Sequence, residues 1–258
     1  VSSVFSSFRE QHDAAWIFTS ATLSVNGKFD HFVQQLGLQD ADTLNLDSPF
    51  DYQNNALLWL PEKLPGPREP SFVPELLNQV RPVLEASKGR AFMLFTSHRA
   101  LRQAAELLPK QTSHPLFVQG EMPRSMLLEA FRRSGDGILL GSASFWGGVD
   151  VMGEALSLVI IDKLPFAPPN DPVMVARSDE LRQHGGNPFM ELFLPQAVIA
   201  LKQGAGRLIR DVNDRGVLVI CDRRLTTKGY GGVFLDSLPP MQQVVERDRV
   251  VEFFSGTS

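Results

Sequence analysis

The stretch RAFMLFTSHRALRQAAELL, residues 90–108, shows the pattern on which the prediction of the fold depends. It begins with a continuous apolar run, as expected of a strand that is covered on both faces. A polar turn, FTSH, follows, and a helical pattern begins at His98. A buried strand joined to a helix by a short polar turn is typical of α/β folds.

The same alternation extends over the whole chain. Apolar runs with strand character recur at 14–20, 56–60, 90–97, 115–119, 136–141, 155–162 and 216–222. Helical patterns lie at 29–37, 71–87, 98–108, 125–134 and 195–210. We therefore predict a RecA-like, doubly wound and mainly parallel sheet with helices on both faces, in one domain over residues 1–258. In such sheets ligands bind beyond the carboxyl ends of the strands.

Composition excludes several classes of protein and site. Hydrophobic content of 43 % and charged content of 21 % are typical of an ordinary globular chain, and a net charge of −4 excludes binding of nucleic acid through bulk positive charge. The single cysteine, Cys221, lies in an apolar run and is predicted to pack in the core. The histidines show no metal-ligand spacing, so we expect no metal held by this chain. No apolar stretch is long enough to span a membrane and no secretory signal is visible, so we expect a cytoplasmic protein.

Polar segments follow three of the expected strands: TSATL (19–23), FTSH (95–98) and GSASFWGGVD (141–150). Each allows a simpler interpretation, as a capping turn, a helix N-cap or a surface loop. A serine nucleophile in the third segment is not expected. Ser144 lies between Ala143 and Phe145, so the Gly-x-Ser-x-Gly pattern is absent.

The segment LKQGAGRLIR, residues 201–210, extends a helical pattern that places Gln203, Arg207 and Arg210 on one face. Gly204 and Gly206 within it each cost about 1 kcal/mol relative to Ala, which indicates close approach of the backbone to another group. A surface helix whose basic residues complement its dipole is the alternative.

Five segments in this order resemble the XPD/DinG-like branch of superfamily-two helicases, with the bacterial DinG/YoaA members nearest. They are TSATL, FTSH, GSASFWGGVD, DKLPF (162–166) and LKQGAGRLIR. Further segments agree: DSPFDY (47–52), FVQG (117–120), NPF (187–189) and CDRRL (221–225). The resemblance covers nearly the whole chain, and five ordered motifs are far more specific than one.

The resemblance implies a motor of two RecA-like lobes with ATP and Mg²⁺ between them, of which this chain is similar to the second. A phosphate-binding loop of the form Gly-x-x-x-x-Gly-Lys-Ser/Thr is absent from the sequence, so the first lobe would hold Mg-ATP. The resemblance implies that any iron–sulfur cluster also lies in that first lobe. This chain alone is predicted to be inactive. A third interpretation, a self-contained nucleotide enzyme, is disfavoured by the same absence.

The resemblance also implies roles for individual residues at the nucleotide. Arg207 and Arg210 match the arginines that stabilise charge on the γ-phosphoryl group, with Gln203 beside them. Asp150, Gly148 and Gly204 match the nucleotide side of the cleft. Gly147 stands where the family usually has glutamate, which puts full coupling of ATP hydrolysis in doubt.

The expected contacts with single-stranded DNA are less specific. The resemblance implies strand contacts from the loops that carry Thr96, Ser97, His98, Gln119, Ser142, Ser144, Phe145 and Trp146. Trp146 has two open interpretations, a base-stacking platform or an indole packed under its own loop. Binding by this lobe alone is expected to be modest and salt-sensitive.

The tail at about 240–258 carries Phe253 and Phe254, for which two interpretations stay open. One is a last helix docked on its own domain, and the other is an anchor for a partner. The resemblance names the chi subunit of the DNA polymerase III clamp loader as a candidate partner.

Two functions from different classes follow. The first is the second lobe of an ATP-dependent 5′→3′ DNA helicase that acts in repair or replication. The alternative is a non-catalytic RecA-like module that docks a protein partner or DNA.

Overall fold

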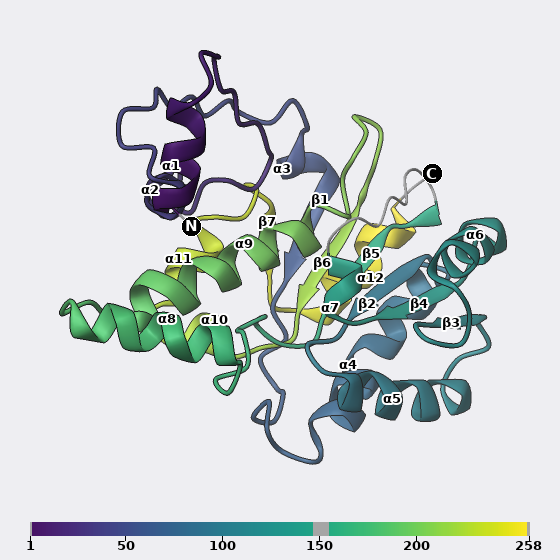
Figure 1. Cartoon of the computed structure of the whole chain (residues 1–258). Helices are drawn as coiled ribbons and strands as arrows, with labels where there is room; N and C mark the ends of the chain where they lie inside the picture. The colour runs from purple at the N-terminus through teal and green to yellow at the C-terminus, as the bar shows by residue number, and fades with distance from the viewer. Residues whose placement is uncertain (1, 147–154, 257–258) are drawn as a thin grey trace. The chain divides into compact units, whose positions relative to one another are not determined.

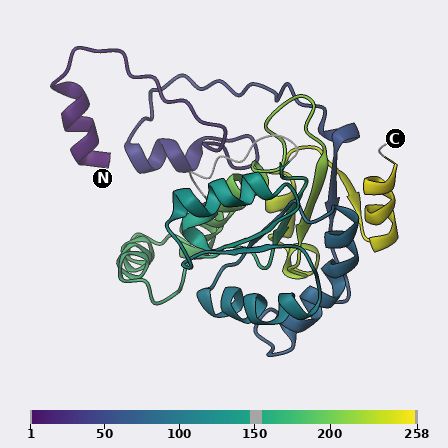
Figure 2. The same ribbon diagram turned by 90° about the vertical axis from the view of Figure 1, so that its right-hand side faces the viewer.

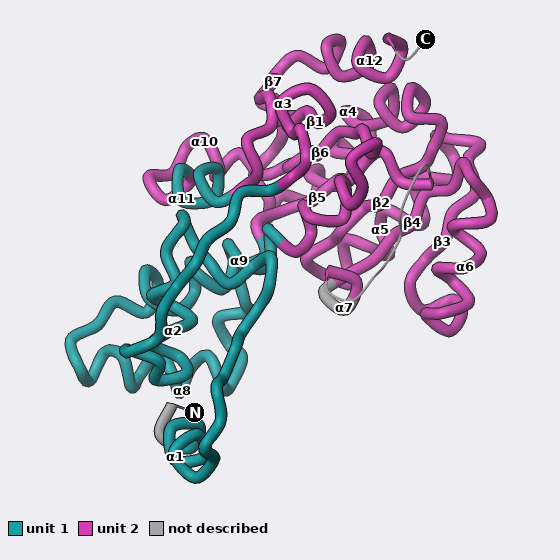
Figure 3. The backbone as a smooth tube through the Cα atoms, turned by 90° about the horizontal axis from the view of Figure 1, so that it is seen from above, with its two compact units in different colours: residues 1–48, 165–202, 232–237 teal, residues 49–164, 203–231, 238–258 magenta. Residues whose placement is uncertain are grey.

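The structure, a computed structural model, describes residues 2–146 and 155–256. The chain divides into two compact units (Figure 3). Unit 1 comprises residues 1–48, 165–202 and 232–237, and unit 2 comprises 49–164, 203–231 and 238–258. Neither unit is a contiguous piece of the chain, and the assignment of residues 1–258 to one lobe stays a prediction.

Unit 2 contains a parallel sheet that has seven strands within the described ranges (Figure 1). The strands are β1 (Ala56–Trp59), β2 (Ala91–Leu94), β3 (Leu116–Val118), β4 (Ile138–Gly141), β5 (Leu158–Ile161), β6 (Gly216–Ile220) and β7 (Gln242–Val244). Their order is β3-β4-β2-β5-β6-β1-β7, and every pairing is parallel. The predicted doubly wound α/β class is confirmed.

The continuous apolar runs become strands because both faces of the sheet are covered. Every residue of β1, β2, β4, β5 and β6 is buried. Since β2 pairs with both β4 and β5, the ends of these three strands lie side by side, with Leu94 opposite Gly141 and Ile161. The segments that follow these strands therefore meet at one edge.

Helices cover the two faces of the sheet in unit 2 (Figure 2). One face packs with α4 (Phe72–Ala86), α5 (His98–Leu107) and α12 (Arg247–Ser255), and the core there includes Met93, Ile160 and Val219. On the other face α6 (Arg124–Ser134) packs against β3, with the rings of Phe117 and Phe131 5.9 Å apart. Shorter helices of unit 2 are α3 (Tyr52–Asn55), η1 (Leu108–Lys110), α7 (Ala143–Trp146) and α10 (Arg224–Thr227), whereas α11 (Gly231–Leu235) belongs to unit 1 except for its first residue.

Unit 1 is mainly helical. It contains α1 (Ser2–Glu10), α2 (Asp30–Leu36), α8 (Pro172–Gln183), the π-helical turn η3 (Phe189–Phe193) and most of α9 (Leu194–Ala205). The side chain of Asn187 accepts hydrogen bonds from the N–H groups of Phe189 and Met190, as an N-cap residue does. The Nζ of Lys202 donates to the carbonyl of Ser24 at 2.8 Å and thereby ties α9 to the end of the TSATL segment.

The predicted strand at 14–20 is wrong. This segment belongs to no strand in the described ranges, and it exposes 37 % of Trp16, 85 % of Ile17 and 37 % of Phe18. A strand requires a neighbour that completes its backbone hydrogen bonds, and β propensity does not supply one.

The predicted helix at 195–210 is too long. α9 ends at Ala205, and Arg207 and Arg210 lie beyond it, so they do not share a helical face with Gln203. Two hydrogen bonds between residues three apart close the last turn. The N–H of Arg207 donates to the carbonyl of Gly204, and the N–H of Leu208 donates to the carbonyl of Ala205. The two glycines lower helix propensity at this point.

Several elements were not predicted, among them β7 and α1, which are short. α8 buries only Met174 and Ser178, so it lacks the apolar stripe of an amphipathic helix. No helix within the described parts of the chain combines the length and the apolar character that crossing a membrane requires.

Candidate functional site at the carboxyl edge of the sheet

The FTSH segment follows β2 at the carboxyl edge of the sheet in unit 2. The N–H of Thr96 donates to Oδ1 of Asp162 at 2.8 Å, and the Thr96 hydroxyl lies 3.4 Å from Oδ2. The Ser97 hydroxyl accepts from the N–H of Ala100 and caps α5. The simpler interpretation of FTSH as a helix N-cap therefore holds for Ser97, and His98 is the first residue of α5.

Three predicted strand-contacting residues lie together at this edge, although they come from three different segments. Gln119 follows β3, Ser142 follows β4, and His98 follows the β2 loop. The Gln119 Oε1 accepts the N–H of Ser142 at 2.6 Å and its hydroxyl at 3.1 Å. The Ser142 hydroxyl lies 3.4 Å from Nε2 of His98.

Phe145 and Trp146 are buried, with 2 % and 5 % of their surfaces exposed. The Phe145 ring packs edge-on against Phe92 at 6.3 Å, and the Arg124 guanidinium carbon lies 5.2 Å from its centroid. For Trp146 the packed interpretation describes this structure, because the indole lies against Gly204 rather than at the surface. Phe145 also serves as a packing residue here.

The segment after α9 brings Arg207 to the end of α7. Its Nε and Nη2 both donate to the carbonyl oxygen of Trp146, at 3.2 Å and 2.9 Å. The N–H of Arg210 donates to Asp214, and Gln203 is half-buried in the last turn of α9. One predicted nucleotide residue is thus bonded directly to the loop that carries predicted DNA residues.

Two buried carboxylates organise this edge. Burial raises the pKa of Asp162 to about 7, against the opposing effects of Lys163 and the hydrogen bonds from Thr96. Asp222, which follows β6, accepts from Arg224 at 2.6 Å and from the N–H of Leu164 at 2.9 Å. Each carboxylate therefore fixes the loop that follows a neighbouring strand.

The prediction of the site omitted Asp162, Asp222, Arg224 and Arg124. A signal was present for the first two, because each is an acidic residue directly after a fully apolar run, in VIID and VICD. Arg224 also carried a signal, because it lies two residues after Asp222 in the quoted segment CDRRL. Arg124 carried none, because nothing in the sequence around it marks the Phe145 ring that it contacts.

Several predicted residues are not described. Gly147, Gly148 and Asp150 lie outside the described residues, as does the side chain of Ser144. Gly204, predicted at the nucleotide, is buried against Trp146. No group of His, Cys, Asp or Glu side chains suited to a metal ion occurs among the residues that the structure describes.

The C-terminal tail forms a helix that packs on unit 2. Val250 of α12 is fully buried in the core, and Phe253 and Phe254 pack partly buried against it. The guanidinium of Arg215 lies 4.0 Å from the centroid of Phe253. Of the two interpretations of the tail, these contacts agree with a last helix that is docked on its own domain.

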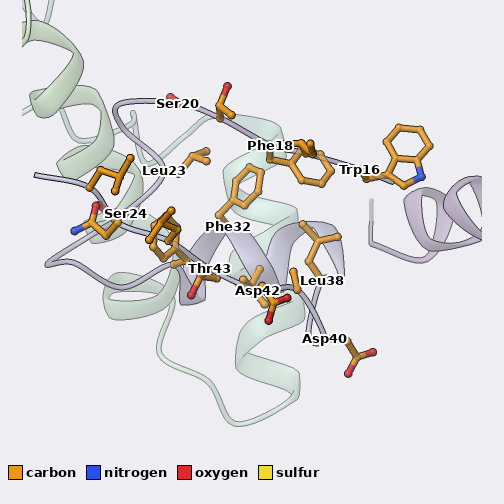
Figure 4. Close-up of a pocket in the computed structure, with 18 of the residues that line it drawn as sticks. Trp16, Phe18, Ser20, Leu23, Ser24, Phe32, Leu38, Asp40, Asp42 and Thr43 are labelled. Atoms are coloured by element: carbon orange, nitrogen blue, oxygen red, sulfur yellow. The ribbon is translucent and has the colours of Figure 1, made fainter. Parts of the chain in front are cut away.

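A separate cavity of about 850 Å³ lies in unit 1 (Figure 4). Its lining includes Trp16, Phe18, Phe32 and Leu38, together with the TSATL segment. TSATL was expected beyond a strand of the sheet, so its place beside this cavity in unit 1 corrects that expectation.

The sequence matches the family described as helicase C-terminal domain over residues 80–241, which is more than half of the chain. The chain belongs to the helicase C-terminal domain family. The match includes every strand from β2 to β6 and ends just before β7.

Relatives of this helicase C-terminal domain agree with the assignment. The chain is 49 % identical over 255 residues to the ATP-dependent DNA helicase YoaA of Escherichia coli strain K12, covering 99 % of the chain and 40 % of that protein. It is 40 % identical over 242 residues to the ATP-dependent helicase DinG of Mycobacterium tuberculosis strain H37Rv, covering 92 % and 36 %. A 3'-5' exonuclease DinG of Bacillus subtilis is 36 % identical over 233 residues, covering 86 % and 25 %.

The solved structure of S. tokodaii Xpd4 shares the fold, with a TM-score of 0.55 and 15 % identity over 76 % of this chain and 39 % of that one. The resemblance to XPD/DinG-like helicases is confirmed. The helicase C-terminal domain spans about two fifths of the length of the YoaA relative. Relatives with different names share this part, so it is a common module.

Proposed function

We propose that the chain is the second motor lobe of an ATP-dependent DNA helicase that translocates 5′→3′ in DNA repair or replication. The relatives named ATP-dependent DNA helicase support the activity. Polarity and pathway rest on the motif resemblance. A cytoplasmic location follows from the same proposal.

The observation that carries the proposal is the convergence of Gln119, His98 and Ser142 at the start of α7, whose last residue, Trp146, accepts hydrogen bonds from Arg207. The exposed imidazole of His98 and the half-buried amide of Gln119 suit contacts with phosphate oxygens along a single strand, and Ser142, which is buried, holds that amide in place. They come from loops after three adjacent strands, where ligands of doubly wound sheets bind. With a net charge of −4, the chain would bind DNA through these local contacts, with strong salt dependence.

ATP and Mg²⁺ would be held mainly by a first lobe outside this chain, as would any iron–sulfur cluster. In this proposal Arg207 and Arg210, with Gln203 beside them in the motif, stabilise charge on the γ-phosphoryl group during hydrolysis, and Asp150 orients the arginines or contacts the sugar of the nucleotide. A planar guanidinium matches phosphate oxygens in pairs, which a lysine cannot do. The absence of a carboxylate at Gly147 is proposed to weaken coupling between the lobes.

The exposed segment 14–20 supports the need for a first lobe. Its β-branched and aromatic residues favour a strand, yet it joins no strand among the described residues, and the side chains of Trp16 and Ile17 stay exposed. We assign the neighbour to the sheet of the first lobe.

The chi subunit of the clamp loader is proposed as a partner on the resemblance alone. Because Phe253 and Phe254 pack on unit 2, a partner would contact the part of each ring that stays exposed. Loss of binding to purified chi by Phe254→Ala, with unchanged stability, would support this contact. Retained binding would place the contact elsewhere.

Mg-ATP hydrolysis tests the proposed function. The chain alone should show no turnover, whereas the longer protein that carries it should hydrolyse ATP when single-stranded DNA is added. Arg207→Ala in the longer protein should lower turnover by about three orders of magnitude. Arg182→Ala, which removes an exposed ion pair with Asp179, is the matched control and should change nothing.

Two outcomes would contradict the motor. Near-normal turnover by the Arg207→Ala variant would show that Arg207 takes no part in ATP hydrolysis. DNA binding without hydrolysis by the longer protein would favour the non-catalytic module.

A further inference from the structure

Trp146 occupies the junction between α7 and α9. Its indole lies under Gly204, where a Cβ would approach Cε3 of Trp146 to 2.9 Å and Cζ3 to 3.1 Å. The same Cβ would meet the Leu94 side chain at 3.2 Å. The glycine in α9 is therefore explained, because any larger residue at 204 would displace the indole.

The backbone of Trp146 holds Arg207. One carbonyl oxygen receives both Nε and Nη2 of the guanidinium, at 3.2 Å and 2.9 Å. Two donors on one acceptor fix the plane of the guanidinium as well as its position. The direction in which Arg207 points thus depends on where Trp146 lies.

The other end of α7 joins the strand-contacting cluster. Ser142 directly precedes α7, and Gln119 holds both its N–H and its hydroxyl. Within the helix, Phe145 is clamped between Phe92 and Arg124. A single helical turn fixed at both ends transmits a displacement instead of absorbing it, because its interior is closely packed.

We propose that Trp146 is a positioning residue that couples strand contact at His98 and Gln119, which both bond to the buried Ser142, to the placement of Arg207. Its indole seats α7 against α9, and its carbonyl aligns the guanidinium. This inference rests on the proposed function, in which Arg207 acts on ATP. It assigns Trp146 no contact with DNA.

Trp146→Phe in the longer protein tests the inference, with ATP hydrolysis measured with and without oligo(dT). The smaller ring leaves space under Gly204, so the ratio of stimulated to unstimulated turnover should fall by about ten-fold. The oligo(dT) concentration that gives half-maximal stimulation and the KM for ATP should stay within about two-fold of their original values. Gly204→Ala should lower the same ratio by pushing the indole from the opposite side.

Trp59→Phe is the matched control. Trp59 is equally buried in β1 and donates to the carbonyl of Val245, far along the chain from α7. This variant should lose stability and keep the stimulation ratio. If it lowers the ratio as much as Trp146→Phe does, a general loss of packing explains the effect and the inference is overturned.

Two further results would overturn it. A raised half-saturating oligo(dT) concentration with full maximal stimulation would mean that the indole contacts the strand itself. If both Trp146→Phe and Gly204→Ala leave the ratio of stimulated to unstimulated turnover unchanged, Trp146 does not couple strand contact to Arg207. Failure of the proposed function is distinguishable, because Arg207→Ala would then retain hydrolysis whatever the Trp146 variant does.

Discussion

The carboxylate of Asp162 accepts a hydrogen bond of 2.8 Å from the backbone N–H of Thr96, across the ends of the neighbouring strands β5 and β2. The carboxyl is completely buried, and burial raises its pKa to about 7. A group that shapes the FTSH loop therefore changes charge near neutral pH.

Asp162→Asn should flatten the dependence of stability on pH. The pKa of about 7 in the folded chain lies above the ordinary value of 3.8, so the folded state binds the proton more tightly than the unfolded state. That stabilisation is complete below the ordinary pKa and is lost as pH rises through about 7. The free energy of unfolding should fall by roughly 2 kcal/mol between about pH 5 and pH 8, and the asparagine variant should lack this component.

Urea unfolding at several pH values measures this slope. The side-chain amide that Asp162→Asn introduces retains an acceptor oxygen for the N–H of Thr96, so the loop should keep its place. Asp47→Asn, at an exposed carboxyl, should leave the profile of the parent unchanged. An equally steep decline in the Asp162→Asn variant would show that other groups cause it.

Arg224→Ala should destabilise unit 2. The Asp222 side chain is fully buried, and Arg224 donates to it through Nε and Nη2. Removal of the arginine leaves an uncompensated carboxylate inside the protein, at a cost of roughly 3 kcal/mol in the free energy of unfolding. Arg224→Lys should cost less, since it keeps the charge and loses the fork.

Thermal and urea unfolding compare these variants with Arg182→Ala. The Arg182–Asp179 pair is exposed on both sides, so its loss should cost less than about 0.5 kcal/mol. Equal losses of stability in the two alanine variants would mean that the buried ion pair contributes no more to the free energy of unfolding than the exposed one.

Val250→Ala should loosen α12. Val250 is fully buried in the core of unit 2, so truncation removes apolar contacts and leaves a cavity, with a loss of roughly 2 kcal/mol. Val245→Ala, at a residue that is 44 % exposed just after β7, is the control and should cost far less. Hydrogen exchange of amides 247–255 should accelerate in the first variant only; unchanged protection would show that the helix is held by other contacts.

The Cys221 thiol should react only after unfolding. It is fully buried near Asp162 and Asp222, and burial together with these carboxylates raises its pKa well above the ordinary value. Labelling with a thiol reagent should therefore be very slow in buffer and fast in denaturant, because the thiolate is the reacting form. Rapid labelling of the folded chain would mean that β6 opens locally.

Segment 14–20 should become protected when the first lobe is present. Backbone amides that lack a strand neighbour exchange quickly, and pairing with a sheet slows exchange. Mass-resolved hydrogen exchange on this chain and on the longer protein compares the two states. Amides of η1, which lies in unit 2, give the internal control and should not change. Equal hydrogen exchange of amides 14–20 in both proteins would show that the first lobe supplies no strand neighbour for this segment.

The strands of the sheet were predictable because each is a local property of the sequence. A run such as LVII is apolar at every position, and only a position covered on both faces requires this. Caps were predictable for the same reason, since Ser97 and Asn187 bond to N–H groups within three residues of themselves.

The sequence predicted which loops contribute to the site, but it did not predict which residues of those loops contact one another. The rule that ligands bind beyond the carboxyl ends of parallel strands selected TSATL, FTSH and GSASFWGGVD, of which TSATL was wrong because 14–20 is no strand. FVQG came from the family resemblance alone. The strand order β3-β4-β2-β5 then decided that Gln119 meets Ser142 and that Asp162 meets Thr96. The sequence alone did not yield that order, so the buried carboxylates were missed.

The sequence by itself determined the α/β class, five of the helices and six of the seven strands in the described ranges, because burial and capping act over a few residues. The tertiary structure alone decided that 14–20 joins no strand of the described ranges and that α9 stops at Ala205. It also decided that Arg207 is bonded to Trp146, a residue 61 positions away. A strand needs a neighbour and a guanidinium needs an acceptor, and which groups become neighbours depends on how distant segments pack.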